Sequence, residues 1–194
     1  INARIFLDEM RQKYGMPDMS ISMIPDEEWL KFKHLGFDIV WLMGVWKTSE
    51  ISKSISMDED FLREFVSKTS IDRNSISASP YSIVEYRLDD FFGFDWELKA
   101  LKDKLNSFGM KLILDFVSNH MAIDSNFSND CVECFVIGDK SDYEKSKELF
   151  CTKRIGDKTY YIAHGRDPNF PPWKDTIQLN YFNPLTRERM IEEL

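Results

Sequence analysis

A carboxylate, an amide and an imidazole follow one another at the end of an apolar segment, which reads Asp115-Phe116-Val117-Ser118-Asn119-His120. Each polar group needs a partner, because a buried donor or acceptor left unpaired costs roughly 1–3 kcal/mol. One interpretation is a site that binds a polar ligand, and the alternative is a structural network that only caps the strand. A metal-dependent hydrolase site made of Asp115, Asn119 and His120 is a weaker hypothesis, since such sites usually contain several histidines or carboxylates.

Aromatic and polar side chains gather in two further segments. Tyr81 and Tyr86 lie close together in the first, and tyrosine rings can stack on the apolar faces of sugars. The alternative is that both are half-buried packing residues with a hydrated hydroxyl. The second segment, residues 164–175, sets polar groups among prolines and Trp173. This composition suits the lining of a carbohydrate cleft and equally suits a rigid surface loop.

The chain has three cysteines, and Cys131 and Cys134 form a C-x-x-C pair. One such pair is weak evidence for zinc, because a structural zinc site needs four ligands. Cys151 and His164 could complete a set, but nothing in the spacing requires it. We expect no disulfide framework, and we therefore predict a reducing compartment and a cytoplasmic location.

Helices and strands are expected to alternate along the chain. The expected elements are a strand at 1–7, a helix at 26–36, a strand at 37–43, a short helix near 61–66, a helix at 95–108, a strand at 111–117 and a helix that begins at Pro184. This order is typical of an α/β fold with a parallel sheet. Active groups in such folds lie at the carboxyl ends of the strands, which is where the segment 115–120 falls.

The helix at 95–108 has the clearest pattern. Leu98, Leu101 and Leu105 recur at spacings of three and four and form one apolar stripe. Asp95 is expected to cap the start of this helix, and Gly109 is expected to end it in the left-handed conformation.

Composition excludes several functional classes. The chain has 194 residues, of which 43% are hydrophobic, so it can bury a core. Its formal net charge of −8 argues against nucleic acid and against anionic membrane surfaces as partners, since both need clustered cations. No apolar run approaches the roughly 20 residues of a membrane-spanning helix.

Taken together, these motifs resemble glycoside hydrolase family 13, the α-amylase family. Residues 115–120 match its D-x-V-x-N-H strand-end motif, and Tyr81 and Tyr86 precede that motif as they do in the family. Residues 37–46 are similar to the second-strand region. Residues 178–184 resemble the short motif that precedes the third barrel helix. The resemblance therefore covers nearly the whole chain in the right order.

The resemblance implies an α/β fold that is a partial (β/α)8 TIM barrel, with the first three β/α units and a long insertion after the third strand. Residues 1–118 would form the first part of the barrel. Residues 119–180 would form a long loop or small inserted subdomain, and residues 181–194 would begin the third barrel helix. A full barrel takes about 250 residues, so the chain would supply only part of one.

The resemblance also assigns roles to individual residues. His120 would hydrogen-bond hydroxyls of the sugar next to the cleaved bond, and Tyr81 would stack on the same sugar. Asp115 would support the site by pairing with an arginine from the fourth strand. Asn119 matches a calcium ligand of many amylases, but Gln178 stands where the family often has an aspartate ligand. Because a neutral oxygen is a weaker ligand for calcium, no cofactor is certain.

The family's catalytic carboxylates follow later strands and would lie beyond Leu194, so no catalytic residue is assigned within the chain. Retaining hydrolysis needs two carboxyl groups ~5–5.5 Å apart, and Asp115 alone cannot fill both roles. The expected function is that of a fragment, inactive alone, of a retaining α-glycosidase or transglycosylase acting on α-linked glucose oligosaccharides or disaccharides. The alternative is a non-catalytic barrel of this type that serves as a scaffold or transporter partner.

Overall fold

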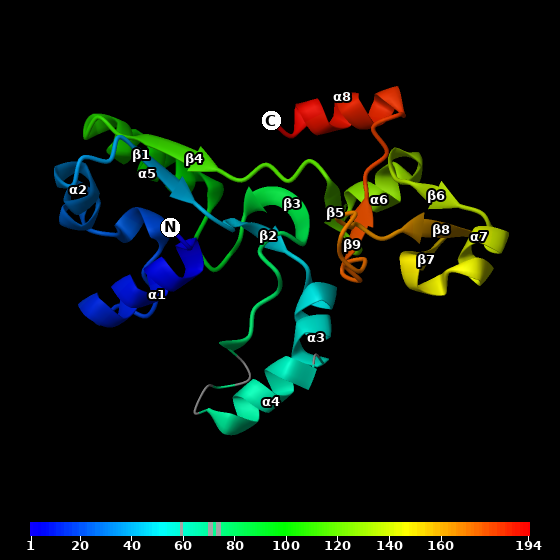
Figure 1. Cartoon of the computed structure of the whole chain (residues 1–194). Helices are drawn as coiled ribbons and strands as arrows, with labels where there is room; N and C mark the ends of the chain where they lie inside the picture. Colours follow the sequence, from blue (N-terminus) through cyan, green and yellow to red (C-terminus); the bar gives the residue numbers. More distant parts are fainter. Residues whose placement is uncertain (59, 70–71, 73–74) are drawn as a thin grey trace. The chain divides into compact units, whose positions relative to one another are not determined.

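We describe the chain from a computed structural model, which covers residues 1–194 except 59, 70–71 and 73–74 (Figure 1). The helices are α1 (Ala3–Tyr14), α2 (Asp26–His34), α3 (Glu50–Asp58), α4 (Asp60–Lys68), α5 (Asp95–Ser107), α6 (Phe127–Asp130), α7 (Lys140–Lys145) and α8 (Pro184–Glu192). The strands are β1 (Ile39–Leu42), β2 (Trp46–Thr48), β3 (Ile83–Leu88), β4 (Lys111–Leu114), β5 (His120–Ala122), β6 (Ile137–Gly138), β7 (Phe150–Ile155), β8 (Lys158–Ala163) and β9 (Thr176–Gln178).

The chain divides into two compact units, each made of two segments. The first unit comprises Ile1–Lys47 and Arg87–Asp115, and the second comprises Thr48–Tyr86 and Phe116–Leu194. The division runs through β2 and β3, which pair with each other. Each unit is therefore assembled from parts of the sequence that are far apart.

The first unit is built around the parallel pair β1 and β4, in register from Ile39 opposite Lys111 to Leu42 opposite Leu114. This pairing confirms the expected parallel arrangement of the two apolar segments. The core beside the pair contains fully buried side chains of α1, α2 and α5, among them Leu7, Trp29 and Leu101. Burial of such side chains removes large apolar areas from water and is the main source of stability for this unit.

The predicted strand at residues 1–7 is wrong, because residues 3–14 form the helix α1. The Oδ1 atom of Asn2 accepts a hydrogen bond from the backbone N–H of Ile5 and caps the helix. Ala3, Leu7 and Met10 recur at helical spacing and are all buried. Strand-like pairing at this end of the described chain is limited to a single bridge from Asn2 to Met43, so the expected layout of three strands in three β/α units is not confirmed.

Helix α5 forms nearly as predicted but begins differently. Gly109 ends it with a φ of 69°, in the left-handed region where glycine is favoured. Asp95, however, does not cap this helix: its Oδ1 atom accepts from the backbone N–H of Leu88 at 2.8 Å. Glu97 instead accepts from the N–H of Phe94 at the helix start, also at 2.8 Å. The cap predicted at Asp95 is therefore wrong, because the backbone N–H at the end of β3 takes up the carboxylate.

A buried carboxylate joins α1 to α2 in the first unit. Glu28 is only 5% exposed, and its Oε1 atom accepts from Lys13 Nζ at 2.5 Å and from the hydroxyl of Tyr14 at 2.6 Å. Its Oε2 atom accepts from Lys31 Nζ at 2.7 Å. The hydrogen bond from Lys13, followed by those from Lys31 and Tyr14, lowers the pKa of Glu28 to about 2.

The second unit contains most of the strands. Strands β5 and β9 form an antiparallel pair, and β6, β8 and β7 form a second antiparallel sheet in that order. Helix α8 begins at Pro184 as predicted, with Asn183 as its cap. In this unit, β5 is paired with a segment more than fifty residues later in the sequence, which decides the geometry of the candidate site.

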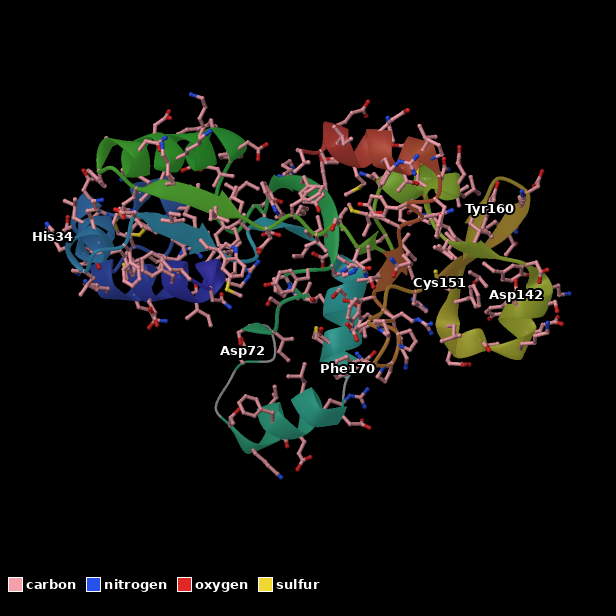
Figure 2. All side chains as sticks on the ribbon, turned by 45° about the horizontal axis from the view of Figure 1, so that its top comes forward. His34, Asp72, Asp142, Cys151, Tyr160 and Phe170 are labelled. Carbon is pink, nitrogen blue, oxygen red and sulfur yellow. A yellow bond between two sulfur atoms is a disulfide. The ribbon has the colours of Figure 1, made fainter. Side chains whose placement is uncertain are left out.

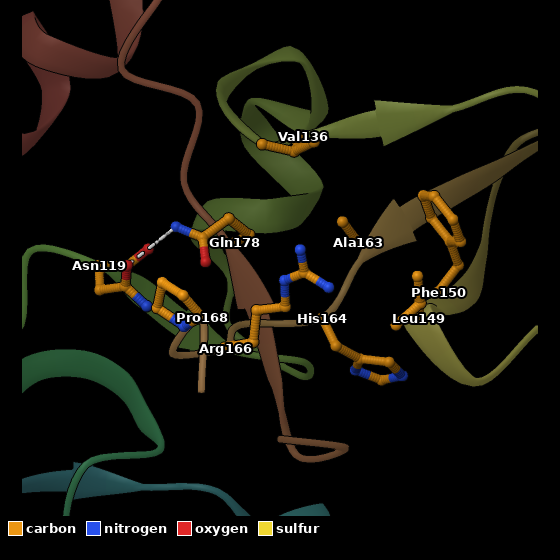
Figure 3. Close-up of a pocket in the computed structure, with 9 residues that line it drawn as sticks. All are labelled: Asn119, Val136, Leu149, Phe150, Ala163, His164, Arg166, Pro168 and Gln178. Atoms are coloured by element: carbon orange, nitrogen blue, oxygen red, sulfur yellow. Dashed lines mark hydrogen bonds between the residues drawn. The ribbon is translucent and has the colours of Figure 1, made fainter. Parts of the chain in front are cut away.

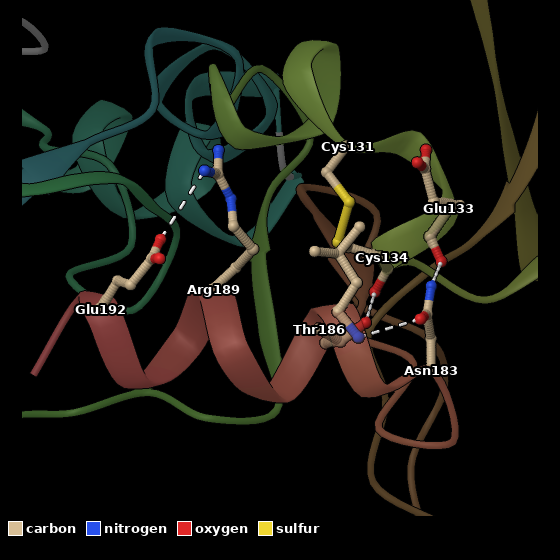
Figure 4. The surroundings of a disulfide bond; sticks show 8 residues. Cys131, Glu133, Cys134, Asn183, Thr186, Arg189 and Glu192 are labelled. Atoms are coloured by element: carbon tan, nitrogen blue, oxygen red, sulfur yellow. Dashed lines mark hydrogen bonds and ion pairs between the residues drawn. A yellow bond between two sulfur atoms is a disulfide. The ribbon is translucent and has the colours of Figure 1, made fainter.

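Cys131 and Cys134, the pair that was weak evidence for zinc, instead form a disulfide (Figure 4). Both cysteines are buried, and the backbone oxygen of Cys134 accepts from the hydroxyl of Thr186 in α8 at 3.1 Å. Cys151 remains a thiol on β7 (Figure 2), and burial raises its pKa to about 11. The cytoplasmic location therefore no longer follows from the cysteines, because disulfides favour oxidising compartments.

The part of the chain that the structure describes contains neither a metal-binding cluster nor a membrane-spanning helix. No group of three or more histidine, cysteine or acidic side chains there is arranged to hold a metal ion, so the zinc hypothesis gains no support. No described helix is long and apolar enough to cross a lipid bilayer.

Candidate functional site

The pairing of β5 with β9 sets His120 opposite Gln178 and brings the side chain of Gln178 onto Asn119. The Nε2 atom of Gln178 lies 2.8 Å from the backbone oxygen of Asn119 and 3.0 Å from its Oδ1 atom (Figure 3). Because a backbone oxygen can only accept, the Gln178 amide must donate here. Its Oε1 atom is directed away from Asn119.

These bonds determine the protonation of His120. Since Asn119 Oδ1 accepts from Gln178, the Nδ2 amide of Asn119 donates to Nδ1 of His120, 3.1 Å away. The proton of a neutral imidazole must then be on Nε2, which donates to the backbone oxygen of Tyr81 at 3.1 Å. His120 is 7% exposed, and burial lowers its pKa, while the Tyr81 oxygen and the charge of Asp175 oppose that change. The imidazole is thus held neutral.

Close packing fixes the position of the imidazole. The ring of Trp173 meets it edge-on, with centroids 5.1 Å apart. A Cβ atom on Gly165 would lie 3.0 Å from the Cβ of His120 and 2.5 Å from Oγ1 of Thr176. Only glycine fits at this position without displacing its neighbours. The segment 164–175 thus supports His120 through Gly165 and Trp173, a role that the sequence does not reveal.

Of the two tyrosines, Tyr86 has a structural role. Its hydroxyl donates to the backbone oxygen of Val117 at 3.1 Å and accepts from the N–H of Val117 at 3.0 Å. Its ring lies against Phe116, with centroids 5.5 Å apart. Tyr81 is half-buried, and its backbone oxygen holds His120. The structure therefore brings Tyr81, Asn119 and His120 together and gives Tyr86 a structural part.

Asp115 belongs to the first unit, unlike Tyr81, Asn119 and His120. Its Oδ1 atom accepts from Nε1 of Trp41 at 3.0 Å, and its Oδ2 atom accepts from the N–H of Gly44 at 2.6 Å. Its backbone oxygen accepts from Nε1 of Trp46 at 2.7 Å. Both carboxylate oxygens thus hold the end of β1. The pairing of Asp115 with an arginine from a later strand stays a prediction.

A pocket of about 460 Å³ lies in the second unit beside Asn119 (Figure 3). Its polar lining includes Asn119, Gln178 and Arg166, whose guanidinium group points into the space. His164 also borders it, but that side chain is buried, and its Nδ1 atom donates to the backbone oxygen of Thr176 at 3.0 Å. The remaining walls are mostly apolar and include Val136, Leu149 and Phe150.

The residues that the resemblance implies for calcium do not fit that ion as they are arranged here. Calcium takes six to eight oxygen ligands, commonly with carboxylates among them. The two oxygens of Asn119 both accept from the Gln178 amide, and none of the described residues that line the pocket is a carboxylate. An amide donor and a guanidinium thus occupy the surroundings in which a cation would need oxygens.

Comparison with known proteins is consistent with this geometry. Residues 28–178 match the family model of the α-amylase catalytic domain. No curated protein is a significant match. Among solved structures, an α-amylase from Lactobacillus plantarum shares 23% identity at a TM-score of 0.57, over 91% of this chain and 33% of that one.

Two other enzyme structures are similar. A trehalose-6-phosphate hydrolase from Bacillus licheniformis has 16% identity and a TM-score of 0.59, over 89% of this chain and 28% of that one. An α-glucosyl transfer enzyme has 16% identity and a TM-score of 0.60, over 89% and 29%. At these identities the likeness shows the fold, which is part of the barrel of such enzymes. The chain spans about a third of their length or less.

Proposed function

The chain belongs to the α-amylase family of glycoside hydrolases, and we propose that it supplies part of the sugar-binding face of an enzyme that cleaves or transfers α-linked glucose. The family match over residues 28–178 supports the chemistry of the whole protein. The single local observation that supports it most is the hydrogen-bonded series from Gln178 through Asn119 and His120 to Tyr81.

In the proposed site, Tyr81 and His120 flank the first sugar. A neutral imidazole has one donor and one acceptor and so suits a sugar hydroxyl, which also has both. The Nε2–H group, which donates to the Tyr81 oxygen at 3.1 Å, is the donor that would be shared with the hydroxyl. The supporting role of Asp115 stays a prediction, and both of its carboxylate oxygens accept from N–H groups at the end of β1.

The bond-breaking groups would come from sequence beyond Leu194. In a retaining mechanism one carboxylate attacks the anomeric carbon while a carboxylic acid ~5–5.5 Å away protonates the leaving oxygen. Residues 1–194 would then bind and orient the sugar without cleaving it. Both hydrolysis and transfer are compatible with this division, because they differ in whether water or a second sugar accepts the glucosyl group.

The test uses the full-length protein and nitrophenyl α-glucoside. We expect release of nitrophenol by the full-length protein and none by an isolated Ile1–Leu194 polypeptide. Calorimetric titration with maltose separates binding from turnover. Binding without turnover by the full-length protein would overturn the enzymatic proposal and favour a scaffold or transporter partner. Absence of both would overturn the sugar site itself.

A further inference from the structure

The pocket beside Asn119 contains a cation without a counterion. Arg166 is exposed to the pocket and makes no hydrogen bond or ion pair with any residue that the structure describes. Acidic residues outnumber basic ones in the chain, 33 to 25, so carboxylates are plentiful elsewhere. None of the described lining residues is acidic. An unpaired guanidinium in a pocket whose described lining has no carboxylate is suited to binding an anion from outside the chain.

The rest of the pocket is suited to a polyol. Its volume of about 460 Å³ falls in the range of small-molecule sites and exceeds what a bare phosphate ion needs. Gln178 donates to Asn119 and thereby leaves its Oε1 atom to accept from a ligand hydroxyl. The apolar side chains of Leu149 and Phe150 offer surfaces for the C–H faces of a sugar ring.

We propose that this pocket binds a phosphorylated sugar, with the phosphate on Arg166 and a ring hydroxyl on Oε1 of Gln178. A planar guanidinium can form two parallel hydrogen bonds to phosphate oxygens, which adds orientation to the attraction of opposite charges. The pocket contacts Asn119 and not the ring of His120, so it is a second site next to the proposed sugar site. The inference does not depend on catalysis by the full-length protein.

Calorimetric titration of the full-length protein tests the proposal with three probes: glucose 6-phosphate, glucose and inorganic phosphate. We expect glucose 6-phosphate to bind most tightly. Arg166→Gln should weaken its binding about ten- to hundredfold, the usual effect of losing a hydrogen bond to a charged group. Arg154→Gln is the matched control, because Arg154 is exposed on β7 and its guanidinium bonds to the adjoining turn, at Gly156 and Asp157.

Several outcomes would overturn the proposal. Equal binding of glucose 6-phosphate by the wild type and Arg166→Gln would remove Arg166 from the site, as would equal losses in both arginine variants. Inorganic phosphate that binds as tightly as the sugar phosphate would leave the sugar without a role. No binding of either phosphate would exclude an oxyanion site. Because the readout is binding, absence of α-glucosidase turnover would count against the proposed function and leave this test unaffected.

Discussion

The Nε2–H group of His120 donates to the backbone oxygen of Tyr81, 3.1 Å away and 39 residues earlier in the sequence. The other ring nitrogen accepts from Asn119, which in turn accepts from Gln178. The donor and acceptor in each bond are fixed by the one before it, starting at the backbone oxygen of Asn119. The series therefore holds only one tautomer of the imidazole, and a change at either end should affect its middle.

Replacing His120 by glutamine should impair sugar use. A flexible glutamine replaces the rigid ring that packs against Trp173 and Gly165. We expect kcat/KM of the full-length protein on nitrophenyl α-glucoside to fall on the order of 10–100-fold. The control is His34→Gln, since His34 is exposed on α2 (Figure 2). An unchanged kcat/KM in the His120 variant would remove the residue from the site.

Stability should fall as the pH drops below neutrality. Burial lowers the pKa of His120, so the unfolded chain binds a proton that the folded chain resists. The contribution of neutral His120 to the free energy of unfolding is fully present above the unfolded pKa, near 6.5. It is lost as the pH falls toward the lower pKa of the folded chain. Urea unfolding between pH 7.5 and 5 should show this slope in the wild type and a shallower one in His120→Gln. Parallel slopes would contradict the neutral tautomer.

Calcium should have no effect on the wild type. We expect the thermal unfolding midpoint to be the same with a calcium chelator as with added calcium. Gln178→Glu removes the donor and sets a carboxylate against the two Asn119 oxygens, so it should cost about 1–3 kcal/mol without calcium. Added calcium should restore part of that loss. Gln12→Glu, on the exposed surface of α1, should show neither effect.

Reduction of the Cys131–Cys134 disulfide should lower stability moderately. The closed loop is short, with a sequence separation of 3, and the chain-entropy estimate for such a loop is about 2 kcal/mol. Dithiothreitol should therefore lower the unfolding midpoint of the wild type and leave that of a Cys131→Ser/Cys134→Ser variant unchanged. Cys151→Ser should respond like the wild type. A midpoint that is insensitive to the reductant in all three would argue against the bond.

The contribution of the buried Glu28 to stability should change at a lower pH than that of His120. Its folded pKa is lowered to about 2, chiefly by the hydrogen bond from Lys13, so its contribution is present above the unfolded value of 4.5. The stability difference between the wild type and Glu28→Gln should be constant above that pH and shrink as the pH falls toward 2. Glu9→Gln, exposed on α1, should show no such change. A difference independent of pH would exclude this role.

Local patterns predicted those elements whose boundaries and faces are set by nearby residues. Helix α5 follows its leucine spacing and its terminal Gly109, and β1 and β4 follow their apolar runs. The strand predicted at residues 1–7 is wrong because the helical pattern of this segment extends past residue 7. Met10 continues the spacing of Ala3 and Leu7, and this spacing is helical. Asp95 does not cap the helix because its carboxylate accepts from the backbone N–H of Leu88 at the end of β3, a contact that no local capping rule contains.

The candidate site could be predicted only in part. The motif at 115–120 identified Asn119 and His120, and Gln178 stood out as an unusual residue within the family resemblance. Their hydrogen bonds, however, depend on the register of β5 against β9, which is a long-range property. The support of His120 by Gly165 and Trp173 depends on the same pairing. These contacts could not be predicted because their residues are far apart in the sequence, although the residue types themselves were informative.

The interleaved segments of the two units bear on how the protein is made. Strand β1 pairs with β4, and Ile39 has no partner until Lys111 has left the ribosome. During synthesis, β1 therefore cannot pair with β4 until the whole first segment of the other unit, Thr48–Tyr86, has emerged. Closing such a long loop carries an entropic cost and slows folding. A nascent chain of this design depends on chaperones or on speed to protect β1 from aggregation until its partner strand is available.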